Sequence, residues 1–325
     1  MNADPQLILF LPLLMAISLT LLVMPFYPAW REWRNPTDGE ALVVLAGKTH
    51  NIITTARLFR KKMLGNRTVP ALVTRAISTF GALDQKTPIY TADDLTLRHG
   101  GKLTEFFTDG SLVLAAHSRV TGWAHAEKDL ELGEGSVAVR QISSAHTIRM
   151  ARGCCFEQLH APVIYFGRKA PGLNIGPGPL PARIFSMEQV PGATPWGQQG
   201  WRVNGDCEIP EACCFKGALV VTGQLSIGAG AVVEGDLKAY KGILVGPHAQ
   251  VCGAMFCEAG IQMTRDCVVA GPVVADTYLL VGNGCVLGTA SAPTTITAGS
   301  ILVGDGVTAH GTLWARQAGL VWGQE

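Results

Sequence analysis

Apolar side chains recur along this chain with a period of 18 residues. In the second half of the chain, one series of large apolar residues keeps this step without a gap. Its members are Ile209, Ile227, Val245, Met263 and Val281. A second aliphatic series starts at Leu225, and a series of glycines starts at Gly217. A fixed period of this length indicates one short unit stacked on itself, because a single such unit cannot bury its apolar face alone.

Within each unit, apolar residues alternate with polar or small ones, as in Leu225-Ser226-Ile227. This is the period of a β-strand, and Gly, Asp, Asn and Pro separate the short runs where tight corners are needed. A repeat of 18 residues divides naturally into three faces. The sequence therefore predicts an all-β fold, a triangular parallel β-helix (β-solenoid) whose coils stack about 4.8 Å apart. The recurring glycines are expected where the backbone needs a positive φ angle.

A weaker copy of the repeat precedes the strong one. Two apolar series keep the same step there: Leu112, Leu130, Ile148 and Phe166, and Leu114, Leu132 and Met150. We therefore expect a first solenoid block at residues 108–167 and a second at 201–325. Residues 168–200 are rich in Gly and Pro, which cannot continue a sheet ladder, so they are expected to be a linker. The pattern is compatible with one continuous rod or with two separate ones.

The amino-terminal part predicts a membrane anchor within residues 1–34. Residues 7–24 are uncharged, and twelve of them are Leu, Ile, Phe or Val, which favours membrane insertion by roughly 4–6 kcal/mol. The alternative is a cleaved signal peptide, but no basic residue precedes the segment and no cleavage site follows it. Arg31 and Arg34 follow the segment, so the positive-inside rule places the bulk of the chain in the cytoplasm and the amino terminus outside.

Residues 35–107 are expected to connect the anchor to the first block. They include a basic amphipathic helix at residues 50–64, with Ile52 and Phe59 on its apolar face. Such a helix either lies on anionic lipid or packs on the open end of the solenoid.

Composition and motifs favour a protein without catalytic chemistry. The net charge is +1 and only 16% of residues are charged, which argues against a nucleic-acid partner and favours self-association. The nine cysteines show no Cys-x-x-Cys spacing, so a reducing compartment and no metal site are expected. No cofactor motif is present. His248 and His310, at corners of the coils, are the candidates for an acyltransferase base, and no carboxylate stands at a spacing that would orient either.

The carboxyl-terminal end is apolar and aromatic, where a capped solenoid would be polar. Trp314, Leu320 and Trp322 either fold over the last coil or dock against the open end of a neighbouring molecule. In the second case the three residues form an assembly interface, where aromatic side chains are favoured.

The repeat resembles that of the bactofilins, the bacterial polymer-forming cytoskeletal family, in their membrane-anchored form. The likeness rests on Gly-Ala-Leu-Val-Val at 217–221, Gly-Asp-Leu-Lys-Ala at 235–239 and the Val-x-Gly corners that begin at Val233, Val251 and Val269. The resemblance implies a right-handed β-helix that polymerises end to end on the membrane without nucleotide.

These features together predict a non-enzymatic scaffold that self-assembles through its β-helix on the cytoplasmic face of the inner membrane. Its expected partners are further copies of itself and membrane lipid through residues 7–24. By analogy with the family, envelope or polysaccharide machinery is its expected client. The alternatives are a hexapeptide-type acyltransferase of sugar or envelope metabolism and a solenoid adaptor that does not polymerise.

Overall fold

The computed structural model contains two compact units, Met1–Leu45 and Ala46–Glu325. It describes residues 15, 18–20, 22–27, 30, 61, 72–74, 78–79, 84–85, 88–168, 183–197 and 200–323. In the first unit the described residues are helical and include the short 3-10 helix η1 (Met24–Phe26). No helix among the described residues is both long and apolar enough to cross a membrane. Most of the predicted anchor at 7–24, and nearly all of the predicted helix at 50–64, lie outside the described residues.

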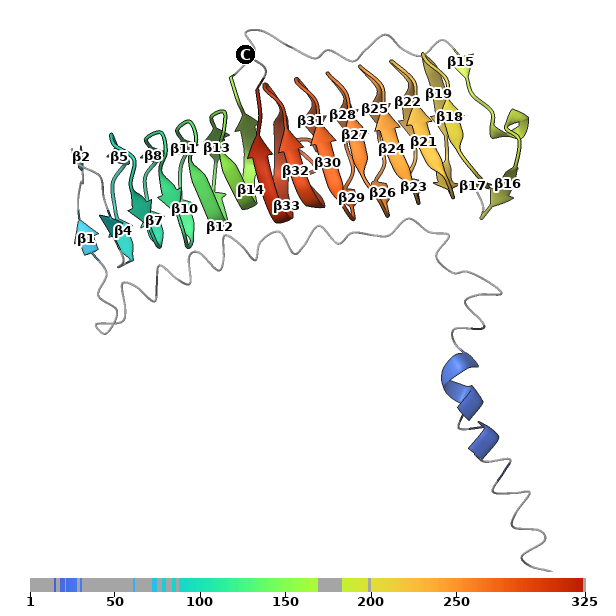
Figure 1. Cartoon of the computed structure of the whole chain (residues 1–325), viewed down its shortest axis with the longest axis horizontal. Coiled ribbons are helices and arrows are strands. Elements are labelled where there is room, and N and C mark those ends of the chain that lie inside the picture. The colour runs from blue at the N-terminus through green and yellow to red at the C-terminus, as the bar shows by residue number, and fades with distance from the viewer. Residues whose placement is uncertain are drawn as a thin grey trace, which may run out of the picture. The chain divides into compact units, whose positions relative to one another are not determined.

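The second unit is a β-solenoid of about 12 turns, which confirms the predicted fold class (Figure 1). The strong repeat forms the ladder that the sequence predicts. Ile227 lies beside Val245, Val245 beside Met263, and Met263 beside Val281 in consecutive parallel strands. All four side chains are buried. Each coil therefore contributes one aliphatic side chain to a continuous interior column.

Three flat faces, named A, B and C here, surround this interior. In the second block, face A contains β17 (Gly200–Val203), β20 (Ala218–Val221), β23 (Leu237–Ala239), β26 (Met255–Cys257) and β29 (Val273–Ala275). Face B contains β19 (Cys213–Lys216), β22 (Val232–Glu234), β25 (Gln250–Val251), β28 (Val268–Val269) and β31 (Val286–Leu287). Face C contains β18 (Cys207–Ile209), β21 (Gln224–Ile227), β24 (Gly242–Val245), β27 (Ile261–Met263) and β30 (Tyr278–Val281). The long strands β32 (Thr294–Val303) and β33 (Thr308–Val321) bend around the last coils.

The first block has the same construction. Face A contains β1 (Leu72–Thr74), β4 (Ile89–Thr91), β7 (Phe106–Thr108), β10 (Ala124–Ala126) and the end of β12 (Val137–Ser144). Face B contains β2 (Ser78–Thr79), β5 (Leu95–Leu97), β8 (Leu112–Leu114), β11 (Leu130–Leu132) and β13 (Thr147–Met150). Face C contains β3 (Asp84–Gln85), β6 (Lys102–Leu103), β9 (Arg119–Val120) and the start of β12. The last strand, β14 (Cys155–Phe166), follows all three faces.

The first block differs from the prediction in extent and in period. Its strands begin at β1, well before residue 108. The step from Ile89 to Phe106 is 17 residues, and Met150 pairs with Phe166 after only 16. Phe166 therefore stands beside Met150 and not in the column of Leu130 and Ile148. Shorter corners account for these steps, because the paired strands keep their register while the connections lose residues.

The expected linker at 168–200 contains regular structure over part of its length. Residues 169–182 lie outside the described residues. After them, β15 (Arg183–Ile184) pairs with β19, η3 (Met187–Gln189) follows, and β16 (Ala193–Trp196) forms an antiparallel pair with β17. Met187 is buried against the core. This segment thus covers the amino-terminal end of the second block.

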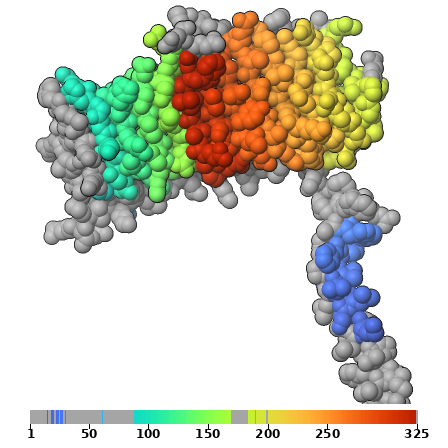
Figure 2. All heavy atoms as spheres, in the orientation of Figure 1, coloured from blue at the N-terminus to red at the C-terminus, as the bar shows by residue number. Residues whose placement is uncertain are grey.

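The two blocks form one continuous prism, because their carboxyl-terminal coils pair with each other. β14 and β33 run antiparallel, whereas neighbouring coils within each block run parallel. In the space-filling view, the red final coil lies directly against the green end of the first block (Figure 2). All three faces continue through this junction, and its interior residues join the core of both blocks. The pairs are Leu159 with Leu313 on face A, Ile164 with Ala309 on face B, and Phe156 with Gly319 on face C.

The glycine series that starts at Gly217 is required mainly by close packing between adjacent coils. Of its members, Gly217 has a positive φ angle, of 114°, but Gly235, Gly253 and Gly271 do not. A Cβ atom at these three positions would lie 2.1, 2.3 and 2.4 Å from the carbonyl oxygen of the preceding glycine in the series. The expected positive φ angle therefore occurs only at Gly217 among the four glycines of the series.

Candidate functional site

Polar contacts at the junction tie the two blocks together. Arg152 Nε donates a hydrogen bond of 3.0 Å to Asp305 Oδ1, and a second guanidinium nitrogen contacts the other carboxylate oxygen. The two side chains are only 26% and 16% exposed, so solvent screens their attraction weakly. His310 Nδ1 donates to the Pro162 carbonyl oxygen at 2.9 Å. The candidate acyltransferase residue His310 thus takes part in joining the blocks.

A second histidine lies inside the junction, on face A. His160 Nδ1 and Thr312 Oγ1 share a hydrogen bond of 2.8 Å. Both side chains are buried, and burial lowers the pKa of His160 below its ordinary value of 6.5. The neutral form of His160 is therefore the form that the junction accommodates.

The expected assembly residues Trp314, Leu320 and Trp322 lie in or next to this last coil, but not on a free end. Their strand, β33, is paired on one side with β32 and on the other with β14. Trp314 projects outward from face A and is 46% exposed. Leu320 is half-buried on face C, and Trp322 follows at the next corner. The three residues therefore occupy different flanks of the prism, where they are available only to lateral contacts.

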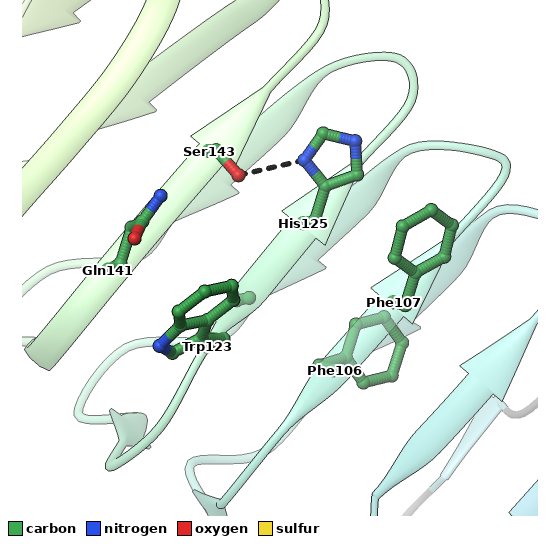
Figure 3. A pocket seen from close by; sticks show the side chains of 7 residues that line it. Phe106, Phe107, Trp123, His125, Gln141 and Ser143 are labelled. Atoms are coloured by element: carbon green, nitrogen blue, oxygen red, sulfur yellow. Dashed lines mark hydrogen bonds between the residues drawn. The ribbon is translucent and has the colours of Figure 1, made fainter. Parts of the chain in front are cut away.

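A hollow on face A of the first block is lined by residues of three neighbouring strands (Figure 3). The lining residues are Phe106, Phe107, Trp123, Ala124, His125, Gln141 and Ser143. His125 Nδ1 and Ser143 Oγ share a hydrogen bond of 2.8 Å, and His125 Nε2 lies 3.8 Å from Glu127 Oε1. Phe107 packs against the imidazole, with ring centroids 5.0 Å apart.

This group of residues resembles a Ser-His-carboxylate set in composition but not in geometry. The serine contacts Nδ1 and the carboxylate lies on the Nε2 side, the reverse of the usual arrangement. Ser143 is only 2% exposed, so its hydroxyl is inaccessible to a substrate carbonyl. The hydrogen bond to Ser143 and the packing of Phe107 hold the buried imidazole in one orientation.

The aliphatic repeat gives no indication of this hollow. The sequence does contain a related pattern, a series of non-aliphatic residues with steps of 17 or 18 residues. Its members are Tyr90, Phe107, His125 and Ser143. They alternate with the inward-facing residues, and only the inward-facing residues form the aliphatic series that predict the fold. Tyr90 continues the column and donates a 2.6 Å hydrogen bond to Asp109 Oδ2.

His248 stands at an exposed corner, as expected, and has a left-handed backbone with a φ angle of 61°. A carboxylate does lie near it, although the contact is longer than a hydrogen bond. Asp266 follows one coil later, and its Oδ2 lies 3.9 Å from His248 Nδ1. The 18-residue step between them was the signal, because equivalent positions of adjacent coils are neighbours in space.

All nine cysteines are free thiols, and most of them are buried. Burial raises the pKa values of Cys154 and Cys207 to about 11, so both remain protonated and unreactive near neutral pH. Within the described part of the chain, no group of three or more His, Cys, Asp or Glu side chains is arranged to hold a metal ion.

No family model matches this chain, and neither does any curated protein or solved structure. The resemblance to bactofilins accordingly rests on the repeat motifs of the chain itself.

Proposed function

We propose that this protein is a non-enzymatic, bactofilin-like scaffold that self-assembles through an end of its β-solenoid. The main support for the proposal is the location, among the described residues, of covered and uncovered strand edges at the two ends of the prism. The junction uses the carboxyl-terminal coils of both blocks, so the two ends of the prism are the amino-terminal ends of the blocks. At one of them β15, η3 and β16 form a cover.

At the other end, β1, β2 and β3 each pair on one side only among the residues that the structure describes, with β4, β5 and β6. Unpaired backbone groups on a sheet edge are a template for a further strand, and natural proteins cover or pair them. A second copy placed end against end supplies matching backbone groups. Two copies joined in this way form a closed dimer, whereas a filament also requires contact through the covered end.

Mass measurement and electron microscopy of residues 46–325 test this proposal. End-to-end association predicts particles whose length is a multiple of the single prism and whose mass rises with concentration. Val73→Pro and Thr74→Pro form a matched pair, because alternate backbone N–H groups of a strand point to opposite sides and only one of the two faces the edge. One variant should abolish association while both remain folded. A monomer at every concentration would contradict the proposal.

Membrane attachment is a separate part of the proposal and rests on residues 7–24. Full-length protein is expected in the membrane fraction, and a variant that lacks residues 1–34 is expected in the soluble fraction. The proposed orientation places the solenoid in the cytoplasm, so protease added to intact spheroplasts should leave it uncleaved. Cleavage of the solenoid by external protease would reverse the orientation without affecting the test of self-assembly.

If the protein is instead an acyltransferase, His248 with its neighbour Asp266 is the candidate general base. An acyl-transfer enzyme should lose acetyl-CoA turnover in the His248→Ala variant, with no change in assembly. Absence of turnover in the unmodified protein is the result expected for a scaffold.

A further inference from the structure

Aromatic side chains occur at every third coil along one outward column of face A. The column crosses the junction and contains Trp123, Gln141, Gln158, Trp314, Thr297, Val274 and Phe256 in this spatial order. Trp123 precedes Ala124 just as Gln141 precedes Ile142, and Ala124 pairs with Ile142, so the first two members also lie on adjacent strands. We refer to these seven residues as the aromatic track.

The side chains of the track point away from the core. Each is flanked along its strand by a buried residue, such as Ala124 beside Trp123, Leu159 beside Gln158 and Leu313 beside Trp314. Trp314 is exposed, and the other members are half-buried. Coils are spaced about 4.8 Å apart, so the aromatic rings recur about every 14 Å along a nearly straight line.

The track begins at the hollow of Figure 3, which gives it one recessed polar position. Trp123 and Gln141 line this hollow together with His125, and Figure 3 shows both on the same side of the imidazole. The His125–Ser143 hydrogen bond and the packing of Phe107 hold the imidazole in place. A ligand lying over the hollow thus meets the aromatic ring of Trp123 and the side-chain amide of Gln141, whereas the His125 imidazole is buried beneath them.

We propose that the aromatic track binds a linear, uncharged oligosaccharide that lies along face A. Pyranose rings have an apolar face that packs on aromatic rings, and their hydroxyl groups exchange hydrogen bonds with amides such as Gln141 and Gln158. Three pyranose units of an extended chain cover a length close to that of three coils. Each aromatic ring can therefore contact every third sugar, while the glutamines face the sugars between them.

The spacing and charge of the track disfavour other extended ligands. A polyproline helix repeats about every 9 Å, which does not match an aromatic spacing of about 14 Å. Single-stranded nucleic acid requires basic side chains beside its stacking platforms. The track from Trp123 to Phe256 has no charged member, and Lys238 follows only beyond Phe256. An uncharged polymer with repeated hydroxyl groups is the ligand class that complements this composition.

Titration calorimetry on the full-length protein in detergent, with cellohexaose, xylohexaose and chitohexaose as probes, tests the proposal. At least one hexasaccharide should bind at least tenfold more tightly than the disaccharide of the same sugar, because only the longer chain reaches two aromatic rings. Trp314→Ala should weaken binding of that hexasaccharide at least tenfold. Gln158→Leu, which preserves shape but removes the amide, should weaken it severalfold.

Trp322→Ala is the matched control, since Trp322 is a similarly exposed tryptophan that lies off face A. It should leave binding unchanged, and both tryptophan variants should show the thermal stability of the unmodified protein. Lack of binding by all three hexasaccharides would overturn the proposal, as would equal binding by the Trp314→Ala and Trp322→Ala variants. A short oligonucleotide or a proline-rich peptide that binds in a Trp314-dependent manner, where the sugars do not, would also overturn it.

Discussion

His160 and Thr312 lie 152 residues apart in the chain, yet their side chains share a buried hydrogen bond of 2.8 Å. The contact joins the last coil of the first block to the last coil of the second. It makes the stability of the junction sensitive to the protonation of His160, because burial lowers the pKa of this imidazole.

We expect the protein to lose stability as the pH falls below the ordinary histidine pKa of 6.5. Burial lowers the pKa of His160 in the folded state, so between the two pKa values the unfolded chain binds more protons than the folded one. The stabilising effect is complete above pH 6.5 and is lost as the pH falls toward the folded-state value. Each unit of difference between the pKa values contributes about 1.4 kcal/mol. Urea unfolding from pH 7.5 to 5 measures the effect.

His160→Gln should flatten this dependence, because glutamine retains a hydrogen-bonding group and does not titrate. His146→Gln, which removes an exposed histidine, serves as the control. If both variants reproduce the slope of the unmodified protein, His160 is not its source.

The Arg152–Asp305 pair should contribute measurably to the junction. Arg152→Ala leaves a partly buried carboxylate without its guanidinium, which we expect to lower the free energy of unfolding by about 1–3 kcal/mol. The Lys216–Glu234 pair is the comparison, since it has a 3.0 Å contact but side chains that are 61% and 47% exposed. Lys216→Ala should leave the free energy of unfolding nearly unchanged, because solvent screens this exposed pair. Equal effects of the two substitutions would show that burial is not the deciding factor.

Gly253 and Gly242 should respond differently to the same substitution. A Cβ atom at Gly253 would lie 2.3 Å from the Gly235 carbonyl oxygen, whereas at Gly242 the nearest heavy atom is 3.8 Å away. Gly253→Ala must push two coils apart, and we expect it to lower the free energy of unfolding by about 1–3 kcal/mol. Gly242→Ala should be neutral within about 0.5 kcal/mol. Thermal and urea unfolding of the two variants provide the measurement.

The Ala212→Gly substitution should raise the free energy of unfolding. It occupies the same corner as Gly230, His248 and Asp266 and has a φ angle of 52°, a conformation that costs a residue with a Cβ atom about 1–2 kcal/mol. Glycine removes this cost but increases the freedom of the unfolded chain, so a net gain of roughly 0.5–1 kcal/mol is expected. Ala229→Gly is the control and should destabilise, because the φ angle of Ala229 is not positive. Stabilisation by both substitutions would contradict the argument.

The second block was predictable because its period is strict from Ile209 to Val281 and lengthens only at the last coils, where Val281 pairs with Val303. An unbroken 18-residue step places Ile227 and Val245 on adjacent strands whatever the details of the corners. The first block was predicted less well, since its steps of 16 and 17 residues near Phe166 and Ile89 break the register that a fixed period assumes.

No local sequence pattern predicts the junction between the blocks or the aromatic track. The pairing of Gln158 with Trp314 joins segments that no repeat relates, and it runs antiparallel where the repeat is parallel. Outward-facing residues such as Trp123 and Trp314 do not belong to the aliphatic series. That they lie in one column is evident only when the pairing of the two blocks is known. The His248–Asp266 pair, in contrast, could have been found by applying the repeat to polar residues.

The placement of β14 and β33 also sets an order of events during synthesis. β14 is complete at Phe166, but β33, the strand that covers its edge, ends much later in the chain, at Val321. At bacterial or eukaryotic translation rates of about 5–20 residues per second, the edge of the nascent first block waits roughly 10–30 s for its partner. During that interval the ribosome-bound chain carries an incomplete sheet, so neighbouring nascent chains on one messenger compete with β33 for the same edge.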